Sequence, residues 1–174
     1  MTVLRRIARL RVTIGFIASI AVLWLAQPTG PSLAIGTIVA AIGEGVRMWA
    51  AGHLEKGREV TRSGPYGFTR HPLYLGSSLI GIGLAIASAS LVVAVLVVAY
   101  LAITLTAAIR TEEAHLTDKF GAAYPAYREG RGAVERRGFS FARAMRNREY
   151  RAILGLLFVI GVLAWKGHIK LVNW

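Results

Sequence analysis

The side chains best suited to chemistry lie in two short stretches on either side of a long uncharged run. The first stretch extends from Arg70 to Gly76, and the second contains Glu112 and Glu113. A guanidinium, an imidazole and two carboxylates can hold a polar or charged ligand through charge-assisted hydrogen bonds. Where a reaction needs a proton acceptor, His71 or one of the two glutamates is the nearest candidate. The two stretches together therefore form a hypothesis for a ligand site.

The run between these stretches must fold so that they can meet. Residues 73–109 contain no charged side chain, and these 37 residues are too many for one crossing of a hydrocarbon core, which needs about 20. They suit a tight pair of helices, with residues 88–90 as a weak turn signal between them. A helical hairpin returns both of its ends to one membrane face, so we expect the two polar stretches to face each other there.

The composition indicates an integral membrane protein. The chain has 174 residues, 55% of them hydrophobic, and a mean hydropathy of +0.51, which is atypical of a soluble domain. We expect one all-α domain, a polytopic membrane helix bundle with about five transmembrane helices. The apolar segments are roughly 12–26, 33–51, 73–87, 91–109 and 152–165. The fifth is short, so it either spans the membrane or continues a helix that begins near residue 139 and first lies along the membrane surface.

The distribution of basic residues predicts the topology. Of 21 Lys and Arg residues, 18 lie within the first 11 residues, the 52–72 loop or the 110–151 segment. The positive-inside rule therefore places the N-terminus and both large loops in the cytoplasm, and we expect a multi-pass protein of a prokaryotic inner membrane. The net charge of +12 is explained in this way. No nucleic-acid-binding pattern accompanies it, so we expect no nucleic-acid partner.

The sequence also limits the kinds of site that the chain can form. It contains no cysteine, which excludes disulfides, thiolate metal sites and a cysteine nucleophile. No spacing of His, Asp and Glu residues matches a metal site, so we expect no metal.

The two polar stretches resemble those of a known family. Residues 63–76 read SGPYGFTRHPLYLG, and at a hairpin's distance residues 110–116 read RTEEAHL and residues 120–127 read FGAAYPAY. Together they resemble the integral membrane methyltransferases, which include isoprenylcysteine carboxyl methyltransferase and the phospholipid N-methyltransferases. The resemblance covers about residues 60–130 and leaves 139–174 as a C-terminal extension. Its strength comes from the two halves occurring in order at a suitable spacing.

The resemblance implies a site for S-adenosylmethionine at the cytoplasmic ends of the helices, without a Rossmann fold. The implied cofactor-binding residues are Arg70, His71, Pro72, Tyr74, Gly76, Glu112 and Glu113. These residue types suit the cofactor, because carboxylates can pair with its sulfonium and ammonium groups and accept hydrogen bonds from its ribose. The rings of Tyr74 and Tyr66 offer aromatic faces for the adenine or the sulfonium.

The resemblance also implies direct methyl transfer to a lipophilic acceptor that approaches from the membrane lipids. The acceptor is either the carboxylate of an isoprenylcysteine-like compound or a lipid head group, and the candidate catalytic residues are Arg47, His71 and Glu113. Arg47 lies within the second apolar segment, three residues after Glu44. The two side chains either neutralise each other on one helix face, or Arg47 steers an anionic acceptor. A carboxylate acceptor needs no base, whereas an amine or hydroxyl acceptor does.

Two other classes of membrane protein share part of this pattern. An NADPH-dependent reductase of the steroid or sterol type also carries an RHPxY-like element followed by a later aromatic pair. The adjacent Glu112 and Glu113 argue against it, because two carboxylates would repel the 2′-phosphate of NADPH. A non-enzymatic membrane scaffold or small transporter would leave the polar stretches unexplained.

Overall fold

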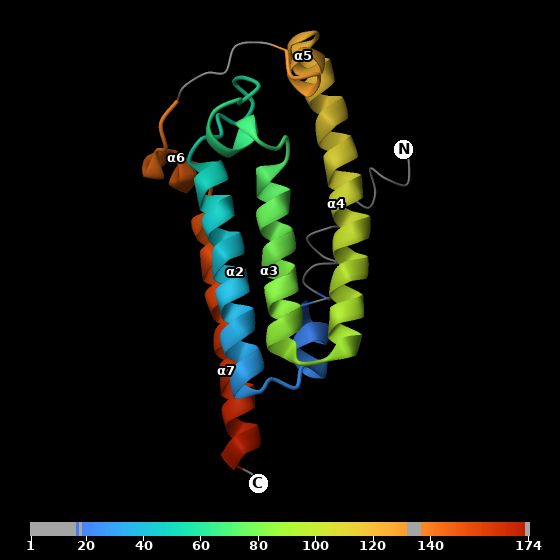
Figure 1. Cartoon of the computed structure of the whole chain (residues 1–174), viewed down its shortest axis with the longest axis vertical. Coiled ribbons are helices and arrows are strands. Elements are labelled where there is room, and N and C mark those ends of the chain that lie inside the picture. Colours follow the sequence, from blue (N-terminus) through green and yellow to red (C-terminus); the bar gives the residue numbers. More distant parts are fainter. Residues whose placement is uncertain (1–16, 18, 132–136, 173–174) are drawn as a thin grey trace.

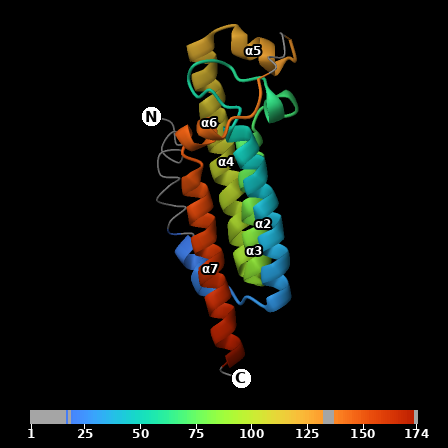
Figure 2. The same cartoon turned by 90° about the vertical axis from the view of Figure 1, so that its left-hand side faces the viewer.

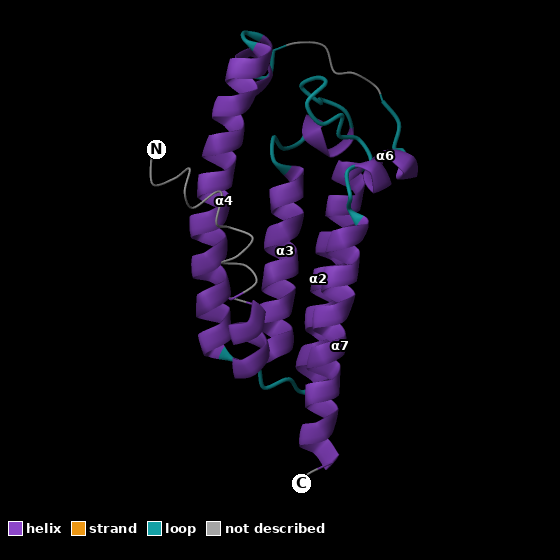
Figure 3. Ribbon diagram, turned by 180° about the vertical axis from the view of Figure 1, so that it is seen from behind, coloured by secondary structure: helices purple, strands orange, loops and turns teal. Residues whose placement is uncertain are grey.

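The computed structural model describes residues 17, 19–131 and 137–172, and within these residues it contains helices and no strand (Figures 1 and 3). This confirms the all-α fold class. Residues 19–25 are helical. They are followed by α2 (Gly30–Ala51), the 3-10 helix η1 (Gly64–Gly67), α3 (Pro72–Ser88), α4 (Leu91–Phe120), α5 (Ala123–Arg128), α6 (Phe141–Arg146) and α7 (Tyr150–Val172).

Three of the described helices, α2, α4 and α7, are long and apolar enough to cross a membrane. In α7 this candidate span covers Tyr150–Ile169, so the expected fifth segment is long enough to cross. The expected third segment is α3, which is apolar but has only 17 residues. Of the expected first segment, 12–26, the structure describes residues 17 and 19–26, whereas residues 12–16 and 18 lie outside the described residues. The described helices thus form a membrane protein whose outer surface exposes large apolar side chains such as Trp24 and Phe158, as a lipid-facing surface requires.

The long uncharged run forms the expected helical hairpin of α3 and α4. The break falls at Ala89, whose φ of 47° is left-handed, and the hydroxyl of Ser90 then caps α4 by accepting a hydrogen bond from the amide of Val93. The second helix is longer than expected, because α4 continues through Glu112 and Glu113. At 30 residues it is about 45 Å long, and its last turns extend beyond the start of α3 (Figure 1).

Helices α2 and α3 approach each other so closely that their backbones are in contact. A Cβ atom added to Gly83 would lie 2.5 Å from the amide nitrogen of Ala40, and one added to Gly43 would lie 2.7 Å from the carbonyl oxygen of Gly76. Small residues permit this approach, which is the usual way in which membrane helices gain packing energy. The pair α2–α3 therefore forms the closest helix–helix contact beside the site.

The C-terminal extension folds back against the end of α2. Helix α6 lies beside that end (Figure 2), and the side-chain amide of Asn147 donates hydrogen bonds to the carbonyl oxygens of Ala51 and Leu54, at 2.9 and 2.8 Å. The expected alternative of one continuous helix from residue 139 is wrong. The chain breaks at Arg148, whose φ of 64° is left-handed, a conformation that interrupts an α-helix.

Candidate functional site

The two polar stretches meet at the end of the α3–α4 hairpin, as the sequence predicts. The hydroxyl of Tyr74 donates to a carboxylate oxygen of Glu112 at 2.6 Å. One carboxylate oxygen of Glu113 lies 3.0 Å from Nε2 of His71 and 3.3 Å from Nη1 of Arg70. Because a carboxylate only accepts hydrogen bonds, Nε2 of His71 is the donor in this contact, and in the neutral form of the ring Nδ1 is then the acceptor nitrogen.

Helix geometry explains why the two glutamates have different partners. Pro72 is the first residue of α3, a position that proline favours because its missing N–H is not needed there. This start places His71 and Tyr74 at the end of the helix that faces α4. Adjacent residues on a helix point about 100° apart, so Glu112 meets Tyr74 and lines a cavity, whereas Glu113 meets His71 and is not among the lining residues.

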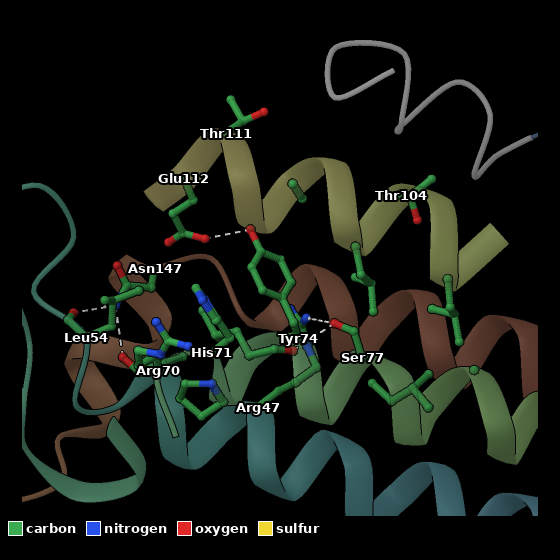
Figure 4. A pocket seen from close by; sticks show the side chains of 18 of the residues that line it. Arg47, Leu54, Arg70, His71, Tyr74, Ser77, Thr104, Thr111, Glu112 and Asn147 are labelled. Atoms are coloured by element: carbon green, nitrogen blue, oxygen red, sulfur yellow. Dashed lines mark hydrogen bonds between the residues drawn. The ribbon is translucent and has the colours of Figure 1, made fainter. Parts of the chain in front are cut away.

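This cavity has a volume of about 1300 Å³ and runs between α3 and α4. Its polar end includes Arg70, His71, Pro72, Tyr74 and Glu112, several of which are labelled in Figure 4. Its apolar wall includes Ile80, Leu84, Leu96, Val97, Leu101 and Leu105. Small-molecule pockets usually measure about 300–1,000 Å³, so this cavity has room for a polar ligand at one end and an apolar chain along the helices.

The 52–71 loop and the short helix α5 cover the polar end of the cavity. The guanidinium of Arg62 donates to the carbonyl oxygen of Ala123 at 2.9 Å and lies over the ring of Tyr127. The hydroxyl of Tyr127 in turn donates to the carbonyl oxygen of Tyr66 at 2.7 Å. These contacts tie the 52–71 loop to α5, and burial raises the pKa of both Tyr66 and Tyr127.

Tyr124 lines the cavity near the carboxylate of Glu113. The residue is buried, and its hydroxyl oxygen has no hydrogen-bond partner within the part of the chain that the structure describes. Burial and the nearby carboxylate of Glu113 raise the pKa of Tyr124 to about 12. A neutral hydroxyl at a cavity wall can both donate and accept a hydrogen bond, so it offers a contact for a ligand.

Arg47 reaches the cavity from α2 and is held by partners that the sequence does not reveal. Its Nε donates to a carboxylate oxygen of Glu149 at 2.7 Å, and its Nη1 donates to the hydroxyl of Ser77 at 2.5 Å (Figure 4 shows the contact with Ser77). The expected partner, Glu44, lies 3.9 Å from Nε. Sequence reasoning missed Ser77, Glu149 and Asn147. For Glu149 there was a signal, since it is the acid within the arginine-rich 143–151 stretch that precedes an apolar run.

Gly76 lies away from the cavity, against α2. A Cβ atom at this position would meet Cγ of Arg47 at 2.5 Å and the carbonyl oxygen of Gly43 at 2.6 Å. The absence of a side chain therefore lets the stem of Arg47 pass between α2 and α3. Of the residues that the resemblance assigns to the cofactor, Gly76 and Glu113 are the two that do not line the cavity.

Within the described residues the fold is all-helical and the two polar stretches meet, which is the arrangement that the resemblance to the integral membrane methyltransferases implies. A sequence model of the phospholipid methyltransferase family matches residues 30–123, more than half of the chain. The chain therefore belongs to the phospholipid methyltransferase family, which confirms the resemblance. The match covers α2, α3 and α4 and ends before Tyr124 and the C-terminal extension. No curated protein and no solved structure matches the chain.

Proposed function

We propose that this protein transfers a methyl group from S-adenosylmethionine to a lipophilic acceptor held in the membrane. The observation that carries this proposal is the shape of the cavity, which joins the polar wall at Tyr74 and Glu112 to an apolar wall along α3 and α4. A charged cofactor and the chain of a lipid can occupy the two ends of such a cavity at the same time. Their reacting atoms then meet where the two walls join.

The residues at the polar end fit the cofactor. The carboxylate of Glu112 can accept hydrogen bonds from its ribose or pair with its positive groups. The hydroxyl of Tyr124, for which the described residues provide no geometric hydrogen-bond partner, can make a further contact. The rings of Tyr66 and Tyr74 line the same end and can lie against the adenine or the sulfonium. When bound, the cofactor supplies a methyl group already activated by its positive sulfur.

Glu113 takes part in this scheme through its neighbours. Its carboxylate is bonded to His71 and Arg70, both of which line the cavity. We assign it the role of fixing the ring of His71, with Nδ1 available to accept a proton. A protonated amine acceptor must give up a proton before its nitrogen lone pair can bond to the methyl carbon as the carbon–sulfur bond breaks. A carboxylate acceptor attacks as the anion and needs no such step.

Arg47 is the candidate contact for the acceptor. It lines the cavity at the depth of α3's second turn, where Ser77 lies. Its remaining N–H groups can hold an oxygen of the acceptor, either the carboxylate of an isoprenylcysteine-like compound or the phosphate of a lipid head group. Membrane lipids are therefore the expected partners, and the positive-inside rule assigns the polar end of the cavity to the cytoplasm.

Calorimetric titration of the detergent-purified protein tests the proposal. We expect S-adenosylhomocysteine to bind and NADPH not to bind. Tritium transfer from methyl-labelled S-adenosylmethionine to phosphatidylethanolamine or to N-acetyl-S-farnesyl-cysteine then identifies the acceptor class. Binding of NADPH without binding of S-adenosylhomocysteine would instead favour a reductase.

A further inference from the structure

Arg47 is held in place by three separate parts of the chain. It belongs to α2, its Nη1 donates to Ser77 on α3, and its Nε donates to Glu149 between α6 and α7. Its stem passes over Gly76, where any side chain would collide with it. A guanidinium with two hydrogen bonds and a closely packed stem is pre-organised, because little rotational freedom remains to be lost when a ligand binds.

Glu149 lies outside the residues that match the family, yet its position is closely determined. Only 4% of its surface is exposed. The left-handed turn at Arg148 directs the chain back towards α2, and the two hydrogen bonds from Asn147 to the end of α2 fix the turn there. The carboxylate of Glu149 therefore reaches Arg47 from a segment that is 102 residues further along the chain.

Glu44 is a second carboxylate that can compete with Glu149 for Arg47. Glu44, one turn earlier on α2, has a carboxylate oxygen 3.9 Å from Nε of Arg47, and neither of its buried carboxylate oxygens has a hydrogen-bond partner among the described residues. Without the charge on Glu149, Glu44 would be the carboxylate left to compensate the guanidinium, because a buried charge without a partner is costly. We expect the guanidinium then to turn towards Glu44 and away from Ser77.

The two contacts that restrain Arg47 leave some of its hydrogen-bond donors for a ligand. A guanidinium has five N–H donors, and within the described part of the chain its hydrogen bonds to Glu149 and Ser77 use two of them. Three donors remain for a ligand oxygen. Since Glu149 also neutralises the charge of Arg47, what remains is mainly a directed set of hydrogen-bond donors.

We propose that Glu149 is a positioning residue of the methyl-transfer site, which holds Arg47 so that its remaining donors face an oxygen of the acceptor's polar group. The proposal rests on the proposed methyl transfer. The C-terminal extension then determines how the acceptor is oriented, although it lies outside the matched family region. The oxygen belongs either to a carboxylate or to a lipid phosphate.

The test compares Glu149→Gln with a matched control, Glu55→Gln. Glu55 also joins the region after α2 to the C-terminal extension, through Arg143 at 2.8 Å, but it does not line the cavity. The acceptors are N-acetyl-S-farnesyl-cysteine for the carboxylate and phosphatidylethanolamine in mixed micelles for the phosphate. We expect Glu149→Gln to lower kcat/KM for the acceptor on the order of 10- to 100-fold, mainly through KM. The affinity for S-adenosylhomocysteine should persist, and Glu55→Gln should leave kcat/KM unchanged.

Repeating the Glu149 substitution in an Arg47→Met protein separates a positioning role of Glu149 from a general structural effect. In protein that already carries Arg47→Met, the change Glu149→Gln should cause no further loss of kcat/KM, because there is no guanidinium left to hold. Glu149→Asp keeps the charge at a shorter reach, so it should fold and show an intermediate loss. This variant keeps the test decisive if Glu149→Gln does not fold.

Three results would overturn the proposal. They are equal kinetic effects of Glu149→Gln and Glu55→Gln, a further loss in the Arg47→Met background, and loss of folding in both Glu149 variants. Failure of the proposed function itself looks different, because the unchanged protein would then neither bind S-adenosylhomocysteine nor methylate either acceptor.

Discussion

Helix α3 packs against its two long neighbours in opposite ways. Towards α2 the backbones touch, and a Cβ atom on Gly83 would lie 2.5 Å from a backbone nitrogen of that helix. Towards α4 the nearest atom to a Cβ on Gly81 would be Cδ1 of Leu101, the far end of a flexible side chain, at 2.7 Å. The cavity lies on this second side, and the α3–α4 contacts at its polar end are made by Tyr74 and His71 with the two glutamates.

The difference shows how one small bundle can be both rigid and open. The glycine-lined face fixes the start of α3, and thereby the polar stretch that begins there, relative to α2 and Arg47. The other face leaves space that a ligand can fill, because side chains and not backbones separate the helices. The proposed function, in which one site holds both a charged cofactor and an apolar chain, calls for this combination of fixed polar groups and free volume.

Two glycines on α3, two residues apart, provide the most direct test of this comparison and the largest expected effect. Gly83→Ala forces a methyl group into the backbone of α2, so we expect a loss of stability of about 1–3 kcal/mol or more. Gly81→Ala meets side-chain atoms alone, Cδ1 of Leu101 at 2.7 Å and Cγ1 of Val97 at 3.2 Å. Both side chains border the cavity and have room to shift, so the effect should be smaller than that of Gly83→Ala. Thermal unfolding of the detergent-purified variants, with size-exclusion chromatography as a check on aggregation, measures both.

Gly155→Ala on α7 is the control, because among the described residues no atom outside the neighbouring turns of α7 lies within 4 Å of an added Cβ there. Alanine is favoured over glycine in a helix by about 0.5–1 kcal/mol, so this variant should be at least as stable as the parent. Similar losses for Gly81→Ala and Gly83→Ala would mean that both faces of α3 are packed alike, and the comparison would fail.

The second test asks whether the side-chain contacts between α3 and α4 serve a ligand or only hold the helices together. We expect Glu112→Gln and Glu113→Gln each to weaken binding of S-adenosylhomocysteine by about 1.5–3 kcal/mol, roughly 10- to 100-fold in Kd, through loss of a charge-assisted hydrogen bond or its support. Isothermal titration calorimetry gives the affinities.

Glu129→Gln is the matched control, since Glu129 is exposed and pairs with Arg131 away from the cavity lining. The affinity of the Glu129→Gln variant for S-adenosylhomocysteine should equal that of the parent. If neither Glu112→Gln nor Glu113→Gln changes the affinity, the two acids form a solvated helix surface. If instead the unfolding temperature falls without a loss of affinity, they hold α3 and α4 together.

The smallest effect is expected where the C-terminal extension attaches by ion pairs instead of by close backbone packing. The hydrogen bond from Arg143, with the further charge of Arg146, holds the pKa of Glu55 below its ordinary value of 4.5. A lowered folded-state pKa means that the ionised form stabilises the fold above the ordinary pKa, and that this contribution is lost as the pH falls through the folded-state value. Glu55→Gln should therefore lower the unfolding temperature slightly at pH 7, and this effect should diminish as the pH falls below about 4.5.

Parallel melting curves of the parent and Glu55→Gln from pH 7 to pH 3.5 measure this difference. For comparison, the deficit of Gly83→Ala should persist at every pH, because overlap between backbones does not titrate. A deficit of Glu55→Gln that does not change with pH would show that its side chain contributes by packing alone.

Much of the site could be predicted from the sequence, because its parts are local. An uncharged run of the right length makes a hairpin, Pro72 marks the start of one helix, and the positions of Glu112 and Glu113 at the far end of the run bring them back to His71 and Tyr74. The length of the run and the rise of a helix determine this meeting without knowledge of any other contact. The family resemblance was visible for the same reason, since its residues lie at these two ends.

The partners of Arg47 were decided only by the tertiary structure. Spacing along α2 favours Glu44, but its hydrogen bonds go to Ser77 on α3 and to Glu149 from the distant extension. That outcome depends on the close approach at Gly76 and on the turn at Arg148. Neither is a property of one helix, because both arise from how far apart two helix axes lie and in which direction the chain leaves a turn. Local spacing can propose which residues pair, but the three-dimensional packing of separate segments determines which carboxylate is nearest.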